Sequence, residues 1–169
     1  MSAVFVFKAI KPKRLKVDAY RLEILNELRK EGTTHRRILA RTVTTWKNPP
    51  KFESIIGLDR EGASVLTGPT GNQEAVQHWV WTDLGTRAHT ISARRAPNLI
   101  FQSGYTAATQ VGKYTSRKAR RHGAWNRRKS VRHPGTEARG WSARLTKERQ
   151  RPFEERMKAA MRRAANKSF

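Results

Sequence analysis

The sequence predicts an α+β protein in which an antiparallel sheet is packed by an N-terminal and a C-terminal helix, with a long basic loop. Three observations predict this class. Leucines recur at helical spacing before residue 31, β-branched residues alternate between residues 36 and 67, and a second apolar helical stripe begins at Trp141. The length of 169 residues fits a single domain, 1–169, with an arm or a tail.

The first part of the chain reads as a strand, a helix and another strand. Residues 1–11 contain a short apolar run, which fits a strand or arm that pairs either within the chain or with another subunit. Leucine spacing predicts a helix over residues 13–31, with Pro12 at its start and Gly32 at its end. The alternation that follows predicts a strand over residues 36–46.

The middle of the chain has the signals of a hairpin, a short helix and a strand. Two runs of strand-forming residues flank a turn at Gly62, so residues 51–67 are predicted to form a hairpin. Apolar spacing favours a short helix over residues 74–81, although a strand also fits there. The apolar run at residues 99–102 predicts a further strand.

The C-terminal segment, residues 141–169, is predicted to be mainly helical. Apolar side chains recur at helical spacing from Trp141 to Ala165. Because proline lacks an amide hydrogen and crowds the preceding turn, Pro152 predicts a break or a kink near Arg151.

Residues 105–130 are predicted to be a basic loop or arm that is poorly ordered on its own. No acidic residue interrupts them, and glycine and serine loosen the backbone. Within this segment, Tyr105, Tyr114 and Trp125 fit a role in which lysines and arginines bind phosphates and aromatic rings stack on bases. The alternative is a loop that is solvated or that faces an acidic neighbour in an assembly. The cations predicted to contact nucleic acid or a partner ring are Lys113, Arg117, Lys118, Arg120, Arg121, Arg127, Arg128, Lys129 and Arg132.

Charge and composition narrow the classes of function. A formal net charge of +23 points first to nucleic acid as the partner and second to an acidic protein surface. The chain has no cysteine, and its five histidines are scattered, so we expect no enzyme, no cofactor and no metal site. No segment approaches the roughly 20 apolar residues of a spanning helix, so no membrane partner is expected.

Two short motifs occur between residues 83 and 136. An aromatic run ends in Asp83-Leu84-Gly85-Thr86, and a later segment reads His133-Pro134-Gly135-Thr136. The residues themselves suggest structural roles for both motifs, because Gly135 allows a positive φ after Pro134 and Gly85 does likewise. The signature residues to which we assign this role are Gly85, Thr86, His133, Pro134, Gly135 and Thr136.

With the leading helix, the hairpin and the closing helix in this order, the chain from roughly residue 50 to 165 resembles the small tail-component family of long-tailed bacteriophages. That family comprises head–tail joining, neck and tail-completion proteins. Trp141 stands where the family usually has phenylalanine, and Asn48-Pro49-Pro50 replaces a usual Thr-Gly dipeptide.

The resemblance implies a structural virion protein, made in the host cytoplasm and placed at the phage neck or the head-proximal end of the tail. It implies a homo-oligomeric ring, often sixfold, around the DNA channel. The implied neighbours are a connector or head-closure ring on one side and tail-terminator or tail-tube proteins on the other. The alternative is a nonspecific nucleic-acid-binding protein, ribosomal or packaging-associated.

Overall fold

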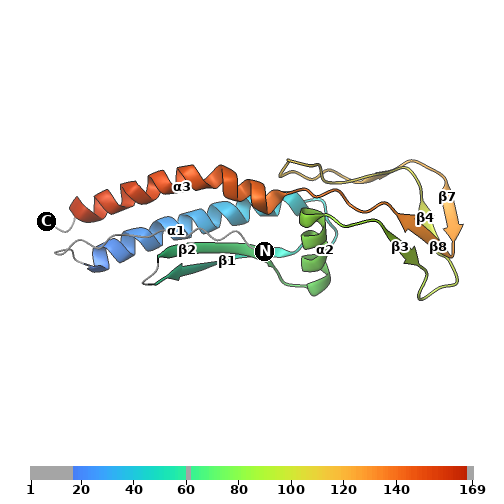
Figure 1. Ribbon diagram of the computed structural model, residues 1–169, viewed down its shortest axis with the longest axis horizontal. Coiled ribbons are helices and arrows are strands. Elements are labelled where there is room, and N and C mark those ends of the chain that lie inside the picture. The colour runs from blue at the N-terminus through green and yellow to red at the C-terminus, as the bar shows by residue number, and fades with distance from the viewer. Residues whose placement is uncertain (1–16, 60–61, 167–169) are drawn as a thin grey trace. The chain divides into compact units, whose positions relative to one another are not determined.

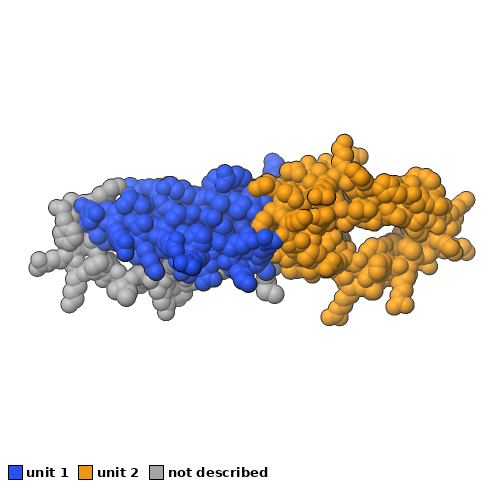
Figure 2. Space-filling model, turned by 90° about the horizontal axis from the view of Figure 1, so that it is seen from above, with its two compact units in different colours: residues 1–40, 51–70, 142–169 blue, residues 41–50, 71–141 orange. Residues whose placement is uncertain are grey.

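The computed structural model describes residues 17–59 and 62–166 (Figure 1). Helices and antiparallel strand pairs make up the fold, which confirms the predicted α+β class. The chain divides into two compact units, coloured in Figure 2. Unit 1 comprises residues 1–40, 51–70 and 142–169, and unit 2 comprises residues 41–50 and 71–141. The strand or arm predicted over residues 1–11 lies outside the described residues, and the single domain remains a prediction.

Unit 1 is built from two long helices and a hairpin, with α1 and α3 side by side in Figure 1. The elements are α1 (Val17–Ala40), β1 (Lys51–Leu58), β2 (Ala63–Thr70) and α3 (Trp141–Asn166), of which unit 1 holds all but the first residue of α3. Strands β1 and β2 pair antiparallel with Ile55 opposite Leu66, which confirms the predicted hairpin. Apolar side chains from both helices and β2 form the core: Ile24, Leu28, Ala63, Val65, Phe153 and Met157.

The predicted end of the first helix at Gly32 is wrong, and so is the strand predicted over residues 36–46. Helix α1 continues to Ala40 and is followed by the 3-10 turn η1 (Arg41–Val43). A Cβ atom on Gly32 would lie 2.9 Å from the Cβ of Ser54, whose hydroxyl donates to the Gly32 carbonyl oxygen over 3.0 Å. Gly32 therefore lets α1 approach the hairpin closely instead of ending the helix.

Helix α3 confirms the predicted helix over the described residues 141–166. The break predicted near Arg151 is wrong, while the kink, the predicted alternative, stays a prediction. The helix runs through Pro152 without interruption. The neighbouring Phe153 is fully buried, and Met157 lies one turn further along the same buried face. Their packing into the core offsets the hydrogen bond that proline cannot form.

A buried carboxylate links the two helices of unit 1. Glu31 on α1 is 0% exposed, and its oxygens accept hydrogen bonds from Nε and Nη2 of Arg149 on α3 over 2.8 and 3.0 Å. Arg156, two turns further along α3, forms a second ion pair with Glu31. Removing one partner of such a pair leaves a buried charge uncompensated, so this contact fixes how α3 packs on α1.

The same carboxylate has a buried histidine beside it. His35 is 2% exposed, its Nε2 atom lies 3.0 Å from Oε1 of Glu31, and its Nδ1 atom lies 3.3 Å from the Thr67 hydroxyl oxygen. Burial, and secondarily the positive charge of Arg149, lowers the pKa of His35 from 6.5 to about 4. The imidazole is therefore neutral at pH 7.

We predict that Glu31→Gln lowers the free energy of unfolding by about 3 kcal/mol. Arg149 loses its charged partner, and Arg156 keeps only its longer ion pair with Glu27. Urea denaturation followed by circular dichroism measures the change. Glu155→Gln is the control, because the Glu155–Arg151 pair is 64% and 89% exposed at its side chains, and it should cost less than about 1 kcal/mol. Equal losses in the two variants would contradict the structural role of Glu31.

We also predict a histidine-dependent loss of stability in acid. Between pH 6.5 and about 4 the unfolded chain protonates His35 while the folded chain does not, so this contribution is complete above pH 6.5 and is lost as the pH falls. The difference in pKa corresponds to roughly 3 kcal/mol. In urea titrations at several pH values, His35→Gln should show a shallower loss across this window. Parallel pH profiles for wild type and variant would rule the mechanism out.

Candidate functional site

Unit 2 contains an antiparallel ribbon made of short nested strand pairs. Strand β3 pairs with β8, β4 with β7, and β5 with β6. Their bounds are β3 His89–Ser92, β4 Leu99–Gln102, β5 Tyr105–Thr106, β6 Arg120–Arg121, β7 Trp125–Arg128 and β8 Ser130–His133. Two isolated β-bridges flank these strand pairs. Thr86 pairs with Thr136 at the base of the ribbon, and Thr109 pairs with Ser116 near the turn at its far end. Residues 86–136 are called the ribbon below.

Helix α2 (Gln73–Leu84) leads into the ribbon and confirms the helix predicted over residues 74–81. Asn72 caps it, because the Asn72 side chain accepts hydrogen bonds from two amides of the first turn. Trp79 anchors the helix: it is buried, and its indole N–H donates to the Thr42 hydroxyl over 3.1 Å. The rings of Trp79 and Trp141 lie 5.7 Å apart between centroids. These contacts fix where the ribbon begins.

The two motifs, far apart in the sequence, meet at the base of the ribbon. The amide of Thr86 donates to the Thr136 carbonyl over 2.9 Å, and the amide of Thr136 donates back over 3.1 Å. Gly85 and Gly135 have φ values of +78° and +95°, as the sequence predicts. A Cβ atom on Gly85 would lie 2.7 Å from the Thr136 oxygen, and one on Gly135 would collide with the Thr86 oxygen. The two glycines therefore let the motifs pair closely.

Asp83 ties the first motif to the start of α3. Its buried carboxylate accepts a hydrogen bond from the Trp141 amide, and the Gly140 amide donates to its carbonyl oxygen over 3.0 Å. The fully buried Trp141 also donates its indole N–H to the Lys113 carbonyl over 2.8 Å. The far end of the ribbon is thereby joined to its base. Sequence reasoning missed Asp83 as a cap, because the capped amide lies 58 residues away.

The predicted basic loop, residues 105–130, contains the short strands β5, β6 and β7, and residues 107–119 between β5 and β6 form no named strand. The poor order predicted for this segment on its own stays a prediction. Two hydrogen-bonding contacts hold the segment near its turn. The hydroxyl oxygens of Ser116 and Thr44 lie 3.0 Å apart, and the Thr45 hydroxyl donates to the Arg117 carbonyl over 3.0 Å. The strand signals were weak because these strands are short, glycine interrupts them, and neither face is fully covered.

The ribbon carries twelve lysines and arginines and no acidic residue. All twelve are exposed, including the nine predicted contact cations. None of them forms an ion pair with another described residue. Sequence reasoning missed three, Arg87, Arg94 and Arg95, although the absence of acids already extends back to Leu84. The predicted cations thus lie together on the ribbon, and none of them has an acidic side chain as an ion-pair partner among the described residues.

Aromatic and apolar side chains lie among these cations. Ile100 faces Arg127 across the β4–β7 pair and Trp125 faces Gln102, so all four share one face of the ribbon. Ile100 is 70% exposed and Trp125 is 68% exposed. Such a face can stack on bases while it binds phosphates, or it can be buried against a protein partner.

Arg121 and Tyr105 form a similar pair on the neighbouring strands. They face each other across β5 and β6, and the Arg121 guanidinium carbon lies 6.0 Å from the centre of the Tyr105 ring. This is a cation–π distance. Tyr105 is 59% exposed, so the ring extends the aromatic and cationic character of the ribbon.

Comparisons with models of protein families, with curated proteins and with solved structures find no match for this chain. Within residues 17–59 and 62–166, no three His, Cys, Asp or Glu side chains are grouped so that they could hold a metal ion. No helix in that part of the chain is long and apolar enough to cross a membrane.

We predict that Gly135→Ala destabilises the protein by at least about 2 kcal/mol more than Gly71→Ala. Both glycines have positive φ, +95° and +102°, but a Cβ on Gly71 meets nothing within 4 Å. The comparison separates backbone strain from collision with the opposite strand. Thermal and urea denaturation measure the difference. Equal losses would mean that the base of the ribbon tolerates wider spacing.

Proposed function

We propose that the protein is a structural virion subunit that forms a ring at the phage neck or at the head-proximal end of the tail. In this proposal the ring encircles the DNA channel, and the ribbon contacts DNA or an adjacent ring. The subunit has no catalytic role. The observation that carries the proposal is the ribbon itself, which is cationic, carries exposed aromatic and apolar side chains, and forms no sheet larger than two strands within the described residues.

The open strands of the ribbon support a role in assembly. Each named strand there pairs with one described neighbour only, so its other edge is available to hydrogen-bond another chain. Exposed Ile100 and Trp125 add apolar area that a partner could bury. Figure 2 shows an opening through unit 2, so the ribbon is not wrapped around a core of its own.

The motifs support the same assignment. The Leu-Gly-Thr and His-Pro-Gly-Thr elements, on which the resemblance to phage tail-completion proteins depends, form hydrogen bonds with each other at the ribbon base. Their pairing gives the resemblance a physical basis in this chain, since it positions the ribbon.

A nonspecific nucleic-acid-binding protein is the second candidate, and the exposed cations favour it. A segment with twelve exposed lysines and arginines and no acid attracts any polyanion. No helix or strand within residues 17–59 and 62–166 presents the side-chain pattern of sequence readout, so such binding would be to the backbone.

The test is the oligomeric state of the purified protein, measured by light scattering and by negative-stain electron microscopy. The proposal predicts closed rings whose mass is a multiple of 19.4 kDa. Because the charge of +23 resists stacking subunits without anions, assembly is measured with and without duplex DNA. A monomer that only coats DNA in a salt-sensitive manner would contradict the ring and favour the second candidate.

A matched pair of variants tests the role of the ribbon cations. The ribbon variant changes Arg120, Arg121, Arg127 and Arg128 to Gln. The control changes Arg21, Arg29, Arg36 and Arg37, which are exposed on α1, and removes the same charge. For each phosphate contact that is lost, the slope of the logarithm of the DNA-binding constant against the logarithm of the salt concentration should become less negative by about 0.9. We expect this change in the ribbon variant alone. Equal effects would mean that net charge, not the ribbon, binds DNA.

A further inference from the structure

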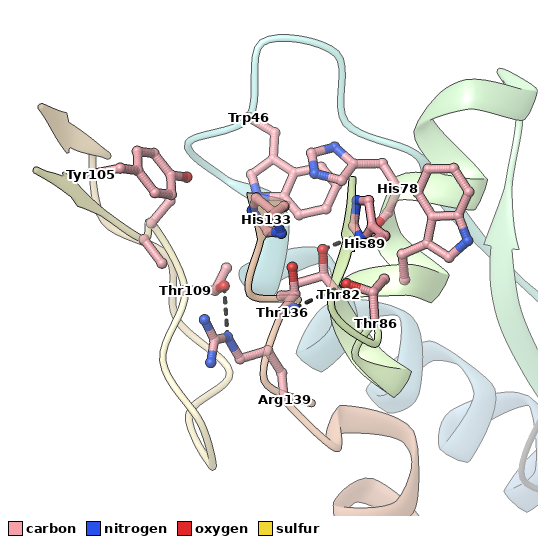
Figure 3. A pocket seen from close by; sticks show the side chains of 13 residues that line it. Trp46, His78, Thr82, Thr86, His89, Tyr105, Thr109, His133, Thr136 and Arg139 are labelled. Carbon is pink, nitrogen blue, oxygen red and sulfur yellow. Dashed lines mark hydrogen bonds between the residues drawn. The ribbon is translucent and has the colours of Figure 1, made fainter. Parts of the chain in front are cut away.

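Unit 2 contains a cavity of about 340 Å³ that the proposed function does not use (Figure 3). Its lining comes from α2, the turn after η1, the base of the ribbon and the returning strands near Thr109. The volume is at the small end of the range for small-molecule sites. The charged, imidazole and aromatic side chains that line it include Arg139, His133, His89, Trp46, His78 and Tyr105.

Arg139 supplies a nearly buried positive charge to this cavity. Its side chain is 10% exposed, and its Nε atom donates to the Thr109 hydroxyl over 3.1 Å. Its carboxylate neighbour, Glu137, lies 3.8 Å from Nη1 and is itself 77% exposed. The two terminal amino groups of Arg139 donate no hydrogen bond to any described residue. A nearly buried guanidinium group whose acidic neighbour is largely exposed is stabilised when an anion binds to it.

Two histidines from opposite strands add polar groups whose hydrogen-bond partners indicate the tautomer of each neutral ring. The Gly135 amide donates to Nδ1 of His133 over 3.0 Å, so the proton of this imidazole is on Nε2. Nδ1 of His89 lies 2.9 Å from the Arg87 carbonyl oxygen, so it donates and leaves Nε2 as an acceptor. The ring centroids lie 5.1 Å apart. His133 can therefore donate to an anion, and no carboxylate lines the cavity to compete.

Flat aromatic surfaces complete the lining. Trp46 stacks on His78 with ring centroids 4.5 Å apart, and Tyr105 lines the cavity while 59% exposed. Every nucleobase has a π face that stacks on such side chains. The exposed cations of the ribbon raise the local concentration of anions around the cavity. An anion that carries a ring therefore matches the site better than a bare ion.

We propose that this cavity binds a nucleoside 5′-monophosphate, with the phosphate at Arg139 and His133 and the base against the aromatic side chains. The ligand is either the free nucleotide or the 5′-phosphorylated end of a DNA strand, which present the same chemistry. The proposal does not depend on ring formation, since all of its residues lie within unit 2 of one chain.

The first test uses full-length wild-type protein labelled with ¹⁵N at histidine. Titration with a deoxynucleoside 5′-monophosphate should shift the resonances of His78, His89 and His133 in a saturable manner. His35 and His122 do not line the cavity and should stay unchanged. The nucleoside without its phosphate should bind at least about tenfold more weakly, a difference of 1.4 kcal/mol. Uniform shifts in all five histidines, or no saturation, would overturn the proposal.

The second test compares two variants of equal charge. Arg139→Gln should weaken nucleotide binding about tenfold or more in calorimetry. Arg41→Gln removes an exposed cation of η1 that lies outside both the ribbon and the lining of the cavity, and should change affinity less than about twofold. Equal losses would show that net positive charge, not the cavity, binds the phosphate. If circular dichroism shows that the Arg139→Gln variant is unfolded, the histidine titration of the wild-type protein tests the proposal alone.

The same titration distinguishes the two sources of the ligand. A short single-stranded DNA with a 5′-phosphate is compared with the same strand ending in a 5′-hydroxyl. If the phosphorylated strand shifts the three cavity histidines and the hydroxyl strand does not, the site takes strand ends. If neither strand shifts them but the mononucleotide does, the site takes the free nucleotide. If both strands shift them equally, internal phosphates are sufficient and the proposal is wrong.

Discussion

The hydrogen bonds between Thr86 and Thr136 hold the base of the ribbon closed, and the geometry of unit 2 depends on them. These two threonines are 50 residues apart, and everything between them folds as a loop whose ends they join. Closing such a loop costs conformational entropy, which the paired strands and the contacts at the far end must offset. The two flanking glycines permit the close approach. Asp83 adds a second tie, because it caps α3 directly after the closure.

Arginine has opposite roles in the two units. In unit 1 the arginines of α3 form ion pairs with glutamates of α1, and a buried carboxylate orients one helix on the other. In the ribbon the arginines have no acidic partner within their own segment and lie at the surface. A charge that is already paired inside the fold contributes little to attracting a partner, whereas unpaired surface charges do so over about a Debye length. The excess charge of the chain is therefore concentrated on the element that is proposed to contact DNA or an acidic ring.

Sequence patterns correctly predicted the elements whose turn residues or apolar spacing lie within the element itself. The hairpin of residues 51–67, helix α2 and the closing helix each show a turn residue or an apolar period within a few residues. The failures depend on contacts between distant segments. From sequence alone Gly32 indicates the end of a helix, and only the close contact with Ser54 shows why a glycine is needed there. Pro152 likewise indicates a break, and only the burial of the adjacent Phe153 shows what stabilises the continuous helix.

The candidate site shows the same limit. The nine predicted cations are exposed, because an acid-free basic segment has no internal partner to bury them. Their arrangement on a doubled-back ribbon was not predictable, since each strand is too short to show a period. Asp83 and Arg139 could not be singled out from sequence, because Asp83 caps an amide 58 residues away and Arg139 contacts a hydroxyl 30 residues away.

Hydrogen–deuterium exchange of the full-length protein, alone and with duplex DNA, tests the central claim most directly. The claim is that the ribbon is a preformed element that receives an anionic partner. It predicts that the amides of Thr86 and Thr136 are protected in the free protein, because both donate hydrogen bonds across the ribbon base. It also predicts that strands β4 and β7 gain protection with DNA while α1 and α3 do not change. Rapid exchange at both threonines in the free protein, or new protection confined to the helices, would contradict the account.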